Sequence, residues 1–303
     1  MTKLGTRGSA LALAQARWVA ARLPDETEVV PITTSGDRAS PRGEGLTLPP
    51  GGDKSRFVKE IEEALLAGAV DLAVHSAKDV PAELPAGLSI VGVPERADAR
   101  DALCGASSLD SLEEGAVVGT GSVRRRAQLL ALRPDLDVRE LRGNVDTRLR
   151  RLAEGGFDAI VLALAGLERL GRRGEGVPLP ELVPAPGQGC LALEARSDDE
   201  ATAEAASELT EQTALVALTA ERAVVTALGA TCNTPIGVHA EQDGEALGLT
   251  AFIGLPDGSH WIRDELDGDP VDPAGLGREV AARLEAAGAA ELLAEAERAV
   301  ARP

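Results

Sequence analysis

The sequence predicts an α/β protein that ends in a small α+β unit. Over most of the first 170 residues, short apolar segments alternate with helical patterns, which is typical of strand–helix units on a parallel sheet. Beyond residue 210, one helix precedes three strand-like segments and two further helices, and this order favours an α+β arrangement. The length of 303 residues suits two or three domains, with no need for disulfide bonds to support a core.

The first 75 residues contain strand–helix units separated by a long loop. The loop at 35–53 is rich in glycine, proline and charge, and such a loop in a compact domain is usually functional or disordered. Ser9 is placed to cap the first helix, and the second helix has Phe57, Ile61 and Leu65 on one face. In order, we expect a strand at 3–6, a helix from Ser9 to Leu23, a strand at 28–32, a helix at 56–67 and a buried strand at 71–75.

The same order repeats in the middle of the chain. Each short apolar segment ends in a polar turn, and an amphipathic pattern follows. The stretch 178–189 is rich in proline and glycine, which is typical of a hinge or of a crossing between domains. The expected elements are a strand at 116–119, a helix at 123–132, a strand at 136–141, a helix at 145–153 and a strand at 159–164.

The last third has a different pattern. Glycine turns at Asp243-Gly244 and Asp257-Gly258 separate successive strand-like segments, as in antiparallel hairpins. The expected elements are a helix at 213–228, strands at 235–240, 247–255 and 260–266, and helices at 274–287 and 290–299.

Charge and apolar content exclude several classes of partner. The net charge of −18 argues against nucleic acid as the main partner. No apolar stretch is long enough to span a bilayer and no signal peptide is visible, so we expect a soluble cytoplasmic protein without a membrane partner. The cysteines at 104, 190 and 232 are too scattered for a disulfide framework or a zinc site, and we expect no metal.

Acidic residues are concentrated in the last third, where residues 198–303 hold 21 Asp and Glu against six Arg. Lysine is scarce, with only Lys3, Lys54, Lys59 and Lys78 in the chain. An acidic, lysine-poor surface is halophile-like, because carboxylates hold hydration and salt screens their repulsion. A GC-rich genome that favours Arg, Ala and Gly codons is the alternative explanation.

Basic residues gather in the turns after the expected strands, where open α/β sheets bind ligands. Helix N-termini there add backbone N–H donors, and arginine binds carboxylates with two hydrogen bonds. Any single arginine is more simply a solvated surface charge. Several such turns in an acidic protein, however, imply a polyanionic ligand. These turn residues are Arg7, Ser9, Ser122, Arg124, Arg125, Arg126, Arg142, Asn144 and Arg148.

Two further residues are candidates for chemistry. Asp79 follows Lys78 just after a buried strand and is suited to acid–base work or to stabilising a cation, although on these residues alone a simple turn Asp before Pro81 is the favoured interpretation. Cys232 lies in a loop between a helix and a strand, where a thiol serves as a nucleophile or attachment point, or is merely inert. Cys104 and Cys190 lie in apolar segments and are expected to be buried.

Together these segments resemble the porphobilinogen deaminase (hydroxymethylbilane synthase) family. They occur in the family's order and span residues 3 to about 260. The matching segments are Arg7-Gly-Ser-Ala-Leu-Ala, Phe57-Val-Lys-Glu, His75-Ser-Ala-Lys-Asp-Val-Pro, Gly119-Thr-Gly-Ser-Val-Arg-Arg, Leu141-Arg-Gly-Asn-Val-Asp-Thr-Arg, Ala165-Gly-Leu-Glu-Arg-Leu, Pro186-Gly-Gln-Gly and Cys232-Asn-Thr-Pro-Ile-Gly.

The resemblance implies three domains. Two α/β lobes would resemble those of two-lobed periplasmic binding proteins, and a small C-terminal α+β domain would carry the cofactor cysteine. The expected boundaries are 1–94 with 190–210 for lobe 1, 95–189 for lobe 2 and 211–303 for the C-terminal domain. The chain would cross between the lobes near 94–98 and return near 184–189.

The resemblance also implies a transferase of tetrapyrrole biosynthesis, the route to heme, siroheme and cobalamin. Such an enzyme joins four porphobilinogen molecules head to tail, releases ammonia each time and yields linear hydroxymethylbilane. The chain grows on one dipyrromethane cofactor, attached by a thioether at the position of Cys232. Asp79 matches the catalytic carboxylate, which would stabilise the cationic azafulvene left when ammonia departs.

The remaining site residues are also carried over from the resemblance. Lys54 is the least regular match, because Ser55 and Arg56 interrupt the family's glycine-rich pattern beside it. The implied cofactor-binding residues are Lys54, Lys78, Asp79, Ser122, Arg124 and Arg125, and the implied substrate-binding residues are Arg7, Ser9, Arg142 and Arg148.

Two rival functions remain open at this point. A two-lobed anion-binding module without catalysis would need the arginines but neither Asp79 nor Cys232. A transferase that forms a Schiff base through Lys54 or Lys78 is a weaker possibility. In each case we expect a small-molecule ligand and a monomer.

Overall fold

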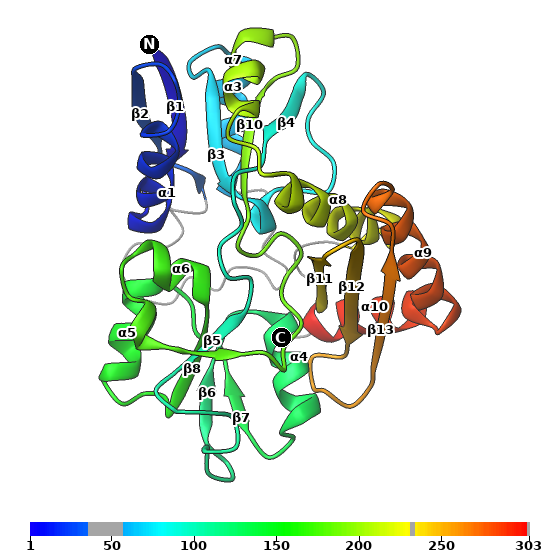
Figure 1. Ribbon diagram of the computed structural model, residues 1–303. Coiled ribbons are helices and arrows are strands. Elements are labelled where there is room, and N and C mark those ends of the chain that lie inside the picture. The colour runs from blue at the N-terminus through cyan, green and yellow to red at the C-terminus, as the bar shows by residue number, and fades with distance from the viewer. Residues whose placement is uncertain (36–56, 231–233, 302–303) are drawn as a thin grey trace.

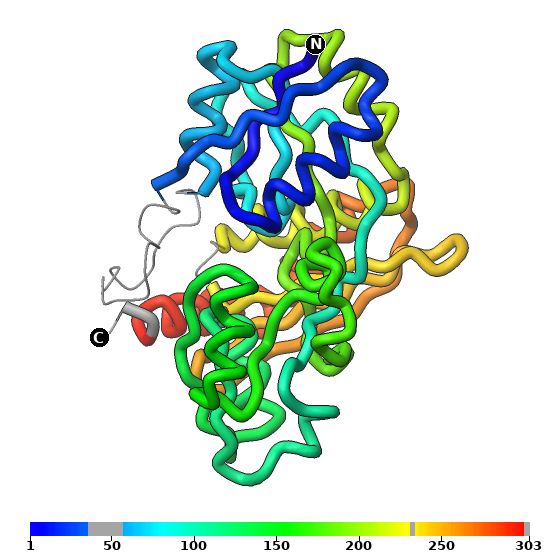
Figure 2. Tube along the Cα trace, turned by 90° about the vertical axis from the view of Figure 1, so that its left-hand side faces the viewer, coloured from blue at the N-terminus to red at the C-terminus, as the bar shows by residue number. Residues whose placement is uncertain are grey.

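The computed structural model describes residues 1–35, 57–230 and 234–301 and contains two α/β lobes and a smaller C-terminal domain (Figure 1). In Figures 1 and 2 one lobe lies above the other, and the C-terminal domain lies beside their junction. The predicted fold class, an α/β protein of two lobes with a small α+β C-terminal domain, is confirmed. Among the helices of the described residues, none is long and apolar enough to cross a membrane.

Lobe 1 is built on a five-stranded sheet with helices on both faces. Helices α1 and α7 pack on one face through Ala16, Val19 and Ala206, whereas α3 covers the other through Ile61 and Leu65. The strands, in sheet order, are β2 (Thr27–Ile32), β1 (Thr2–Arg7), β3 (Leu72–Ser76), β10 (Leu191–Arg196) and β4 (Leu88–Gly92). The helices are α1 (Ala10–Ala20), α3 (Lys59–Leu66) and α7 (Glu200–Ser207).

Lobe 2 has a second five-stranded sheet of the same design. Leu129 of α4 packs on one face with Val118 and Val161, and Leu149 of α5 packs on the other with Ile160. The strands, in sheet order, are β7 (Asp137–Arg139), β6 (Val117–Gly119), β8 (Ala159–Ala163), β5 (Asp101–Cys104) and β9 (Val177–Leu179). The helices are α4 (Val123–Leu132), α5 (Val145–Ala153) and α6 (Leu164–Arg169), followed by the short turn η3 (Arg173–Glu175).

The two sheets share one topology, and this corrects the expectation of a parallel sheet. In each lobe three adjacent strands are parallel, β2-β1-β3 and β7-β6-β8. The fourth strand, β10 or β5, is antiparallel to its neighbours on both sides. That strand enters each lobe directly from the other one: β5 follows β4 of lobe 1, and β10 follows β9 of lobe 2. Because this strand comes from the other lobe, it begins at the junction. The three parallel strands end at the junction, so the two kinds of strand run in opposite directions.

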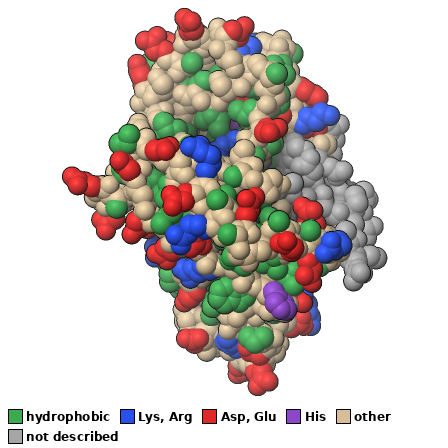
Figure 3. Space-filling view, turned by 90° about the vertical axis from the view of Figure 1, so that its right-hand side faces the viewer, with side chains coloured by type: hydrophobic (Ala, Val, Ile, Leu, Met, Phe, Trp, Pro, Cys, Tyr) green, Lys and Arg blue, Asp and Glu red, His purple; other side chains and the backbone are tan. Residues whose placement is uncertain are grey.

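The C-terminal domain is an antiparallel sheet packed against helices. The sheet order is β11-β12-β13, and the main core is formed by apolar residues such as Val224, Val238, Leu249 and Leu284. Its elements are α8 (Gln212–Ala227), β11 (Ile236–Asp243), β12 (Ala246–Gly254), β13 (Trp261–Gly268), α9 (Pro273–Ala286) and α10 (Ala289–Ala301). Figure 3 shows acidic side chains scattered over the face that includes this domain, with fewer basic ones among them.

Contacts at the junction bring the three parts together. Helix α1 of lobe 1 contacts α6 of lobe 2, where Leu11 lies close to Gly166. Phe252 of β12 packs with Ala127 and Val183 of lobe 2. Because β1 and β8 end near this junction, the turns that follow the parallel strands of each lobe lie toward the other lobe (Figure 1).

Candidate active site

Three helices in the predicted ligand turns begin with a side-chain cap. The Oγ of Ser9 accepts from the amide of Ala12 at 3.3 Å, and the Oγ of Ser122 accepts from the amide of Arg125 at 3.4 Å. Asn144 caps α5 in the same way at 2.9 Å. Each cap satisfies one N–H and leaves others of the first turn available for an anion. Ser9 and Ser122 thus hold the helix N-termini at the junction.

Asp79 lies on the short 3-10 turn η2 (Ala77–Asp79), directly after β3. Lys78 and Asp79 are half-buried there. The Nζ of Lys78 donates to the Oε1 of Gln188 at 3.2 Å. His75, four residues earlier, is a core residue with its Nε2 at 3.0 Å from Glu194. The turn η2 therefore begins at the buried end of β3, and the side chain of Lys78 is directed toward Gln188 of lobe 2.

Arg124 and Arg125 are buried and share one carboxylate. Arg124 Nη1 lies 2.7 Å from Asp101 Oδ2, and Arg125 Nη2 lies 2.8 Å from Asp101 Oδ1. Burial alone would raise the pKa of Asp101, but the two guanidinium groups outweigh burial and hold that pKa well below its usual range. Asp101 is therefore ionised, and the three charges leave one net positive charge inside lobe 2.

Arg148 adds a second unbalanced positive charge nearby. Its Nε donates to the carbonyl of Gly143 at 2.8 Å, and no ion pair to a carboxylate is found for it among the described residues. Burial, together with the positive charge of Arg125, lowers the pKa of Arg148 to about 10. An anion bound here would offset both the burial of the Arg148 charge and its repulsion by Arg125. This region of lobe 2 is therefore suited to a carboxylate ligand.

The structure does not bring every predicted residue into this group. Arg142 pairs with Glu140 at 2.5 Å, and its side chain is 52% exposed. The guanidinium of Arg7 lies 4.1 Å from the centre of the Phe57 ring in lobe 1. Lys54 and Cys232 lie outside the described residues. Cys104 and Cys190 are buried as expected, and burial raises their thiol pKa values to about 11 and about 12.

Three residues that sequence reasoning did not single out belong to the same region. Asp101 is the shared partner of the arginine pair, and Gln188 links it to Lys78. Arg169, at the end of α6, donates to the carbonyl of Gly189 at 2.6 Å, and burial lowers its pKa. Their only sequence signal is that Gln188 and Arg169 fall inside the matched segments beginning at Pro186 and Ala165.

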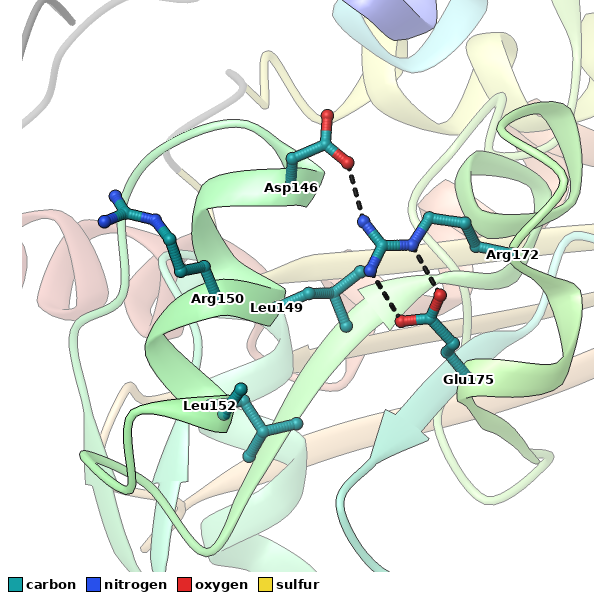
Figure 4. Close-up of a pocket in the computed structure, with 7 residues that line it drawn as sticks. Asp146, Leu149, Arg150, Leu152, Arg172 and Glu175 are labelled. Carbon is teal, nitrogen blue, oxygen red and sulfur yellow. Dashed lines mark hydrogen bonds and ion pairs between the residues drawn. The ribbon is translucent and has the colours of Figure 1, made fainter.

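One surface hollow of the described residues is a different feature. It lies on lobe 2 between α5 and η3, has a volume of about 530 Å³ and is lined by Leu149 and Arg150 among others. Figure 4 shows Arg172 there, between Asp146 at 2.6 Å and Glu175 at 2.5 Å. The guanidinium groups of Arg150 and Arg172 and the carboxylates of Asp146 and Glu175 balance, so this hollow has no positive surplus and does not fit the polyanionic ligand.

Comparison with known proteins gives one consistent result. "Porphobilinogen deaminase, dipyromethane cofactor binding domain" matches residues 2–204, and "Porphobilinogen deaminase, C-terminal domain" matches residues 215–286. Porphobilinogen deaminase of Deinococcus radiodurans is 48% identical over 96% of this chain and 97% of its own. That of Thermus thermophilus is 49% identical over 96% of this chain and 98% of its own.

Among solved structures, an ABC transporter protein from Parabacteroides distasonis covers 68% of this chain and 69% of its own, with 16% identity and a TM-score of 0.42. The family matches extend over both lobes and most of the C-terminal domain. The chain belongs to the porphobilinogen deaminase family.

Proposed function

We propose that this chain acts as a porphobilinogen deaminase, a transferase that condenses four porphobilinogen molecules head to tail into hydroxymethylbilane and releases one ammonia at each step. The observation that carries this proposal is the positive surplus of Arg124, Arg125 and Arg148 in lobe 2. Hydrogen bonds through Asp101 and Gln188 connect the first two arginines to Lys78 in the Asp79 turn. Porphobilinogen carries an acetate and a propionate, so the growing product is a polyanion with several carboxylates. The family membership favours this function over a non-catalytic anion-binding module.

The described residues fit the dipyrromethane cofactor of this family. The Nε of Arg124 is buried and has no hydrogen-bond partner among the described residues, and Arg148 is an arginine without an acidic partner there. A ligand carboxylate would accept a hydrogen bond from the Nε of Arg124 and would supply the acidic partner that Arg148 lacks. We propose that Cys232 holds the cofactor by a thioether and that its binding residues are Lys54, Lys78, Asp79, Ser122, Arg124 and Arg125. The cofactor supplies a covalent primer on which the product is built.

The chain's own residues then have distinct tasks. The carboxylate of Asp79 binds pyrrole N–H groups and stabilises the positive charge that develops on the substrate as ammonia departs. Arg148 and Arg7 bind ligand carboxylates, and the Ser9 turn adds N–H donors. Arg142 contributes to the same task when it exchanges Glu140 for a ligand carboxylate, since its present ion pair is exposed and weak.

The role of Asp79 is tested by Asp79→Asn, which keeps the size of the side chain and removes its charge. We expect ammonia release from porphobilinogen to fall by about 10²- to 10⁴-fold. Glu83→Gln, an exposed carboxylate four residues away, is the matched control and should retain turnover. Near-normal turnover in Asp79→Asn would refute the assigned role.

The cofactor is tested by the intact mass of the denatured protein. We expect a mass above the 31.2 kDa chain by two pyrrole units, lost in Cys232→Ser and kept in Cys104→Ser. If the purified chain has no added mass, incubation with porphobilinogen should produce the addition. A chain that stays unmodified after this incubation contradicts the covalent cofactor.

We further propose the domain division 1–94 with 190–210, 95–189 and 211–303. Sheet membership supports it, because the chain leaves the first sheet after β4 and returns to it at β10. We also infer a cytoplasmic monomer with a halophile-like acidic surface, supported by the charge of −18. Unchanged stability between dilute buffer and molar salt would count against the halophile-like character.

A further inference from the structure

Gln188 is a buried amide that joins the two lobes. Its side chain lies in the return segment from lobe 2 to lobe 1, and the residue is 1% exposed. The Nε2 donates to the carbonyl of Ala99 at 2.7 Å and to Asp101 Oδ1 at 2.8 Å. The Oε1 accepts from Lys78 Nζ at 3.2 Å. Because Ala99 and Asp101 offer only acceptors, the nitrogen must face them, and the oxygen is left for Lys78.

The partner in lobe 2 is itself held in place. Asp101 is fully buried and binds Arg124, Arg125 and Gln188 at once. Arg124 also donates to the carbonyl of Val183 at 2.6 Å. A chain of hydrogen bonds therefore runs from Lys78 through Gln188 and Asp101 to both guanidinium groups.

The backbone around Gln188 is equally restricted. Gly187 has φ of 74°, and a Cβ there would lie 2.9 Å from the backbone nitrogen of Lys78, so only glycine permits this approach. Its N–H donates to Glu221 Oε2 at 2.6 Å, and the carbonyl of Gln188 accepts from Arg96 Nε at 3.1 Å. These backbone contacts therefore leave the side-chain amide of Gln188 one available position.

We propose that Gln188 is a positioning residue that sets Lys78 of lobe 1 at a fixed place relative to Arg124 and Arg125 of lobe 2. Cations from both lobes then meet the carboxylates of one bound polyanion at a set spacing. A neutral amide suits this task, because it orders the flexible lysine without cancelling its positive charge. The inference rests on the proposed function, in which these three cations bind the ligand.

The contact is tested first by lysine labelling, which needs no substrate. The full chain is reductively methylated with formaldehyde and an amine–borane, and the rate at Lys78 is divided by the rate at Lys59, whose side chain is 67% exposed. In Gln188→Met, loss of the acceptor should raise this ratio by about tenfold, as expected for a hydrogen bond to a charged group.

Gln128→Met is the matched control. Gln128 is also buried, at 3% exposed, but its amide bonds only to the backbone N–H and carbonyl of Val183. We expect a similar loss of thermal stability in both methionine variants and no change of the Lys78 ratio in Gln128→Met. An unchanged ratio in Gln188→Met, or an equal rise in Gln128→Met, overturns the proposal.

The second arm measures porphobilinogen turnover. Gln188→Met should raise KM by about tenfold with a smaller change in kcat, and this effect should vanish in a Lys78→Met background. Additive effects of the two substitutions would overturn the positioning role even if the labelling ratio had changed. Absence of turnover in the wild-type chain would refute the proposed function alone, since the labelling result does not depend on it.

Discussion

Two groups of arginines in lobe 2 differ in how the protein balances their charge. Arg124 and Arg125 share a single buried carboxylate, Asp101, which leaves a positive surplus. Arg172 in the surface hollow pairs with two carboxylates, Asp146 and Glu175, and Arg150 also lines the hollow, so the lining has no net charge (Figure 4). The hollow is the more evident cavity, yet the buried pair is the better anion site. Charge balance, and not the size of a hollow, separates a ligand site from a surface ion pair here.

The largest expected effect comes from removing the shared carboxylate. Asp101→Asn leaves two buried guanidinium groups without a counter-charge, and we expect a loss of about 3–5 kcal/mol in the free energy of unfolding. Urea denaturation at pH 7 measures this loss. Asp146→Asn, whose side chain is 52% exposed, is the control and should change stability far less. A loss below about 1 kcal/mol in Asp101→Asn would contradict the buried network.

The same carboxylate predicts a pH dependence with a definite sign. Its pKa in the folded chain lies below the unfolded value of about 3.9, so the folded chain holds this proton less tightly. The stability contributed by Asp101 is therefore complete above about pH 5 and is lost as pH falls through its folded-state pKa. In Asp101→Asn this part of the acid dependence should be absent.

Arg148 provides the second test, because its charge has no carboxylate partner among the described residues and is less deeply buried than the charges of Arg124 and Arg125. Arg148→Met should raise the KM for porphobilinogen by about tenfold, since a charge-assisted hydrogen bond is lost. The apo chain should not lose stability, because burial already disfavours the charged form and lowers its pKa to about 10. As pH rises through 10, wild-type binding should weaken toward that of the variant. Destabilisation of the apo chain together with an unchanged KM would show that Arg148 is structural.

A smaller effect should follow from adding a simple anion to cofactor-free Cys232→Ser protein. Citrate that binds the positive surplus should raise Tm by about 2–4 °C relative to sodium chloride of equal ionic strength, as expected for occupancy near ten times Kd. The shift should vanish when Arg148→Met is added and persist when Arg172→Gln is added. An equal shift in both variants would mean that citrate acts on the whole surface.

Much of the fold was predictable because its signals are local. The helices at 123–132 and 145–153 have the predicted limits, since Ser122 and Asn144 cap them and their apolar faces have helical spacing. The sequence patterns do not predict the short strands β4, β5 and β9 or the helices α6 and α7. Strand β5 is only four residues long, and the sequence shows it only as an apolar run around Cys104.

The site was less predictable, because its decisive contacts join distant parts of the chain. Gln188 and Asp101 are 87 residues apart, and Gln188 and Lys78 are 110 apart. A sequence pattern shows that Arg124 and Arg125 follow a strand, but it does not show that one carboxylate serves both. The same limitation applies to Arg142, whose partner Glu140 is close in sequence but whose exposure depends on the packing of lobe 2.

The smallest effect should come from the surface hollow itself. Arg172→Gln removes one partly exposed guanidinium from two carboxylates, and we expect a change in unfolding free energy of no more than about 1 kcal/mol, with KM for porphobilinogen unchanged. The loss should shrink further as salt is raised, because exposed ion pairs are screened. Steady-state kinetics and urea denaturation at two salt concentrations measure both quantities. A KM rise comparable to that of Arg148→Met would mean that the hollow binds ligand although it has no positive surplus, and charge balance would then fail to distinguish the two groups.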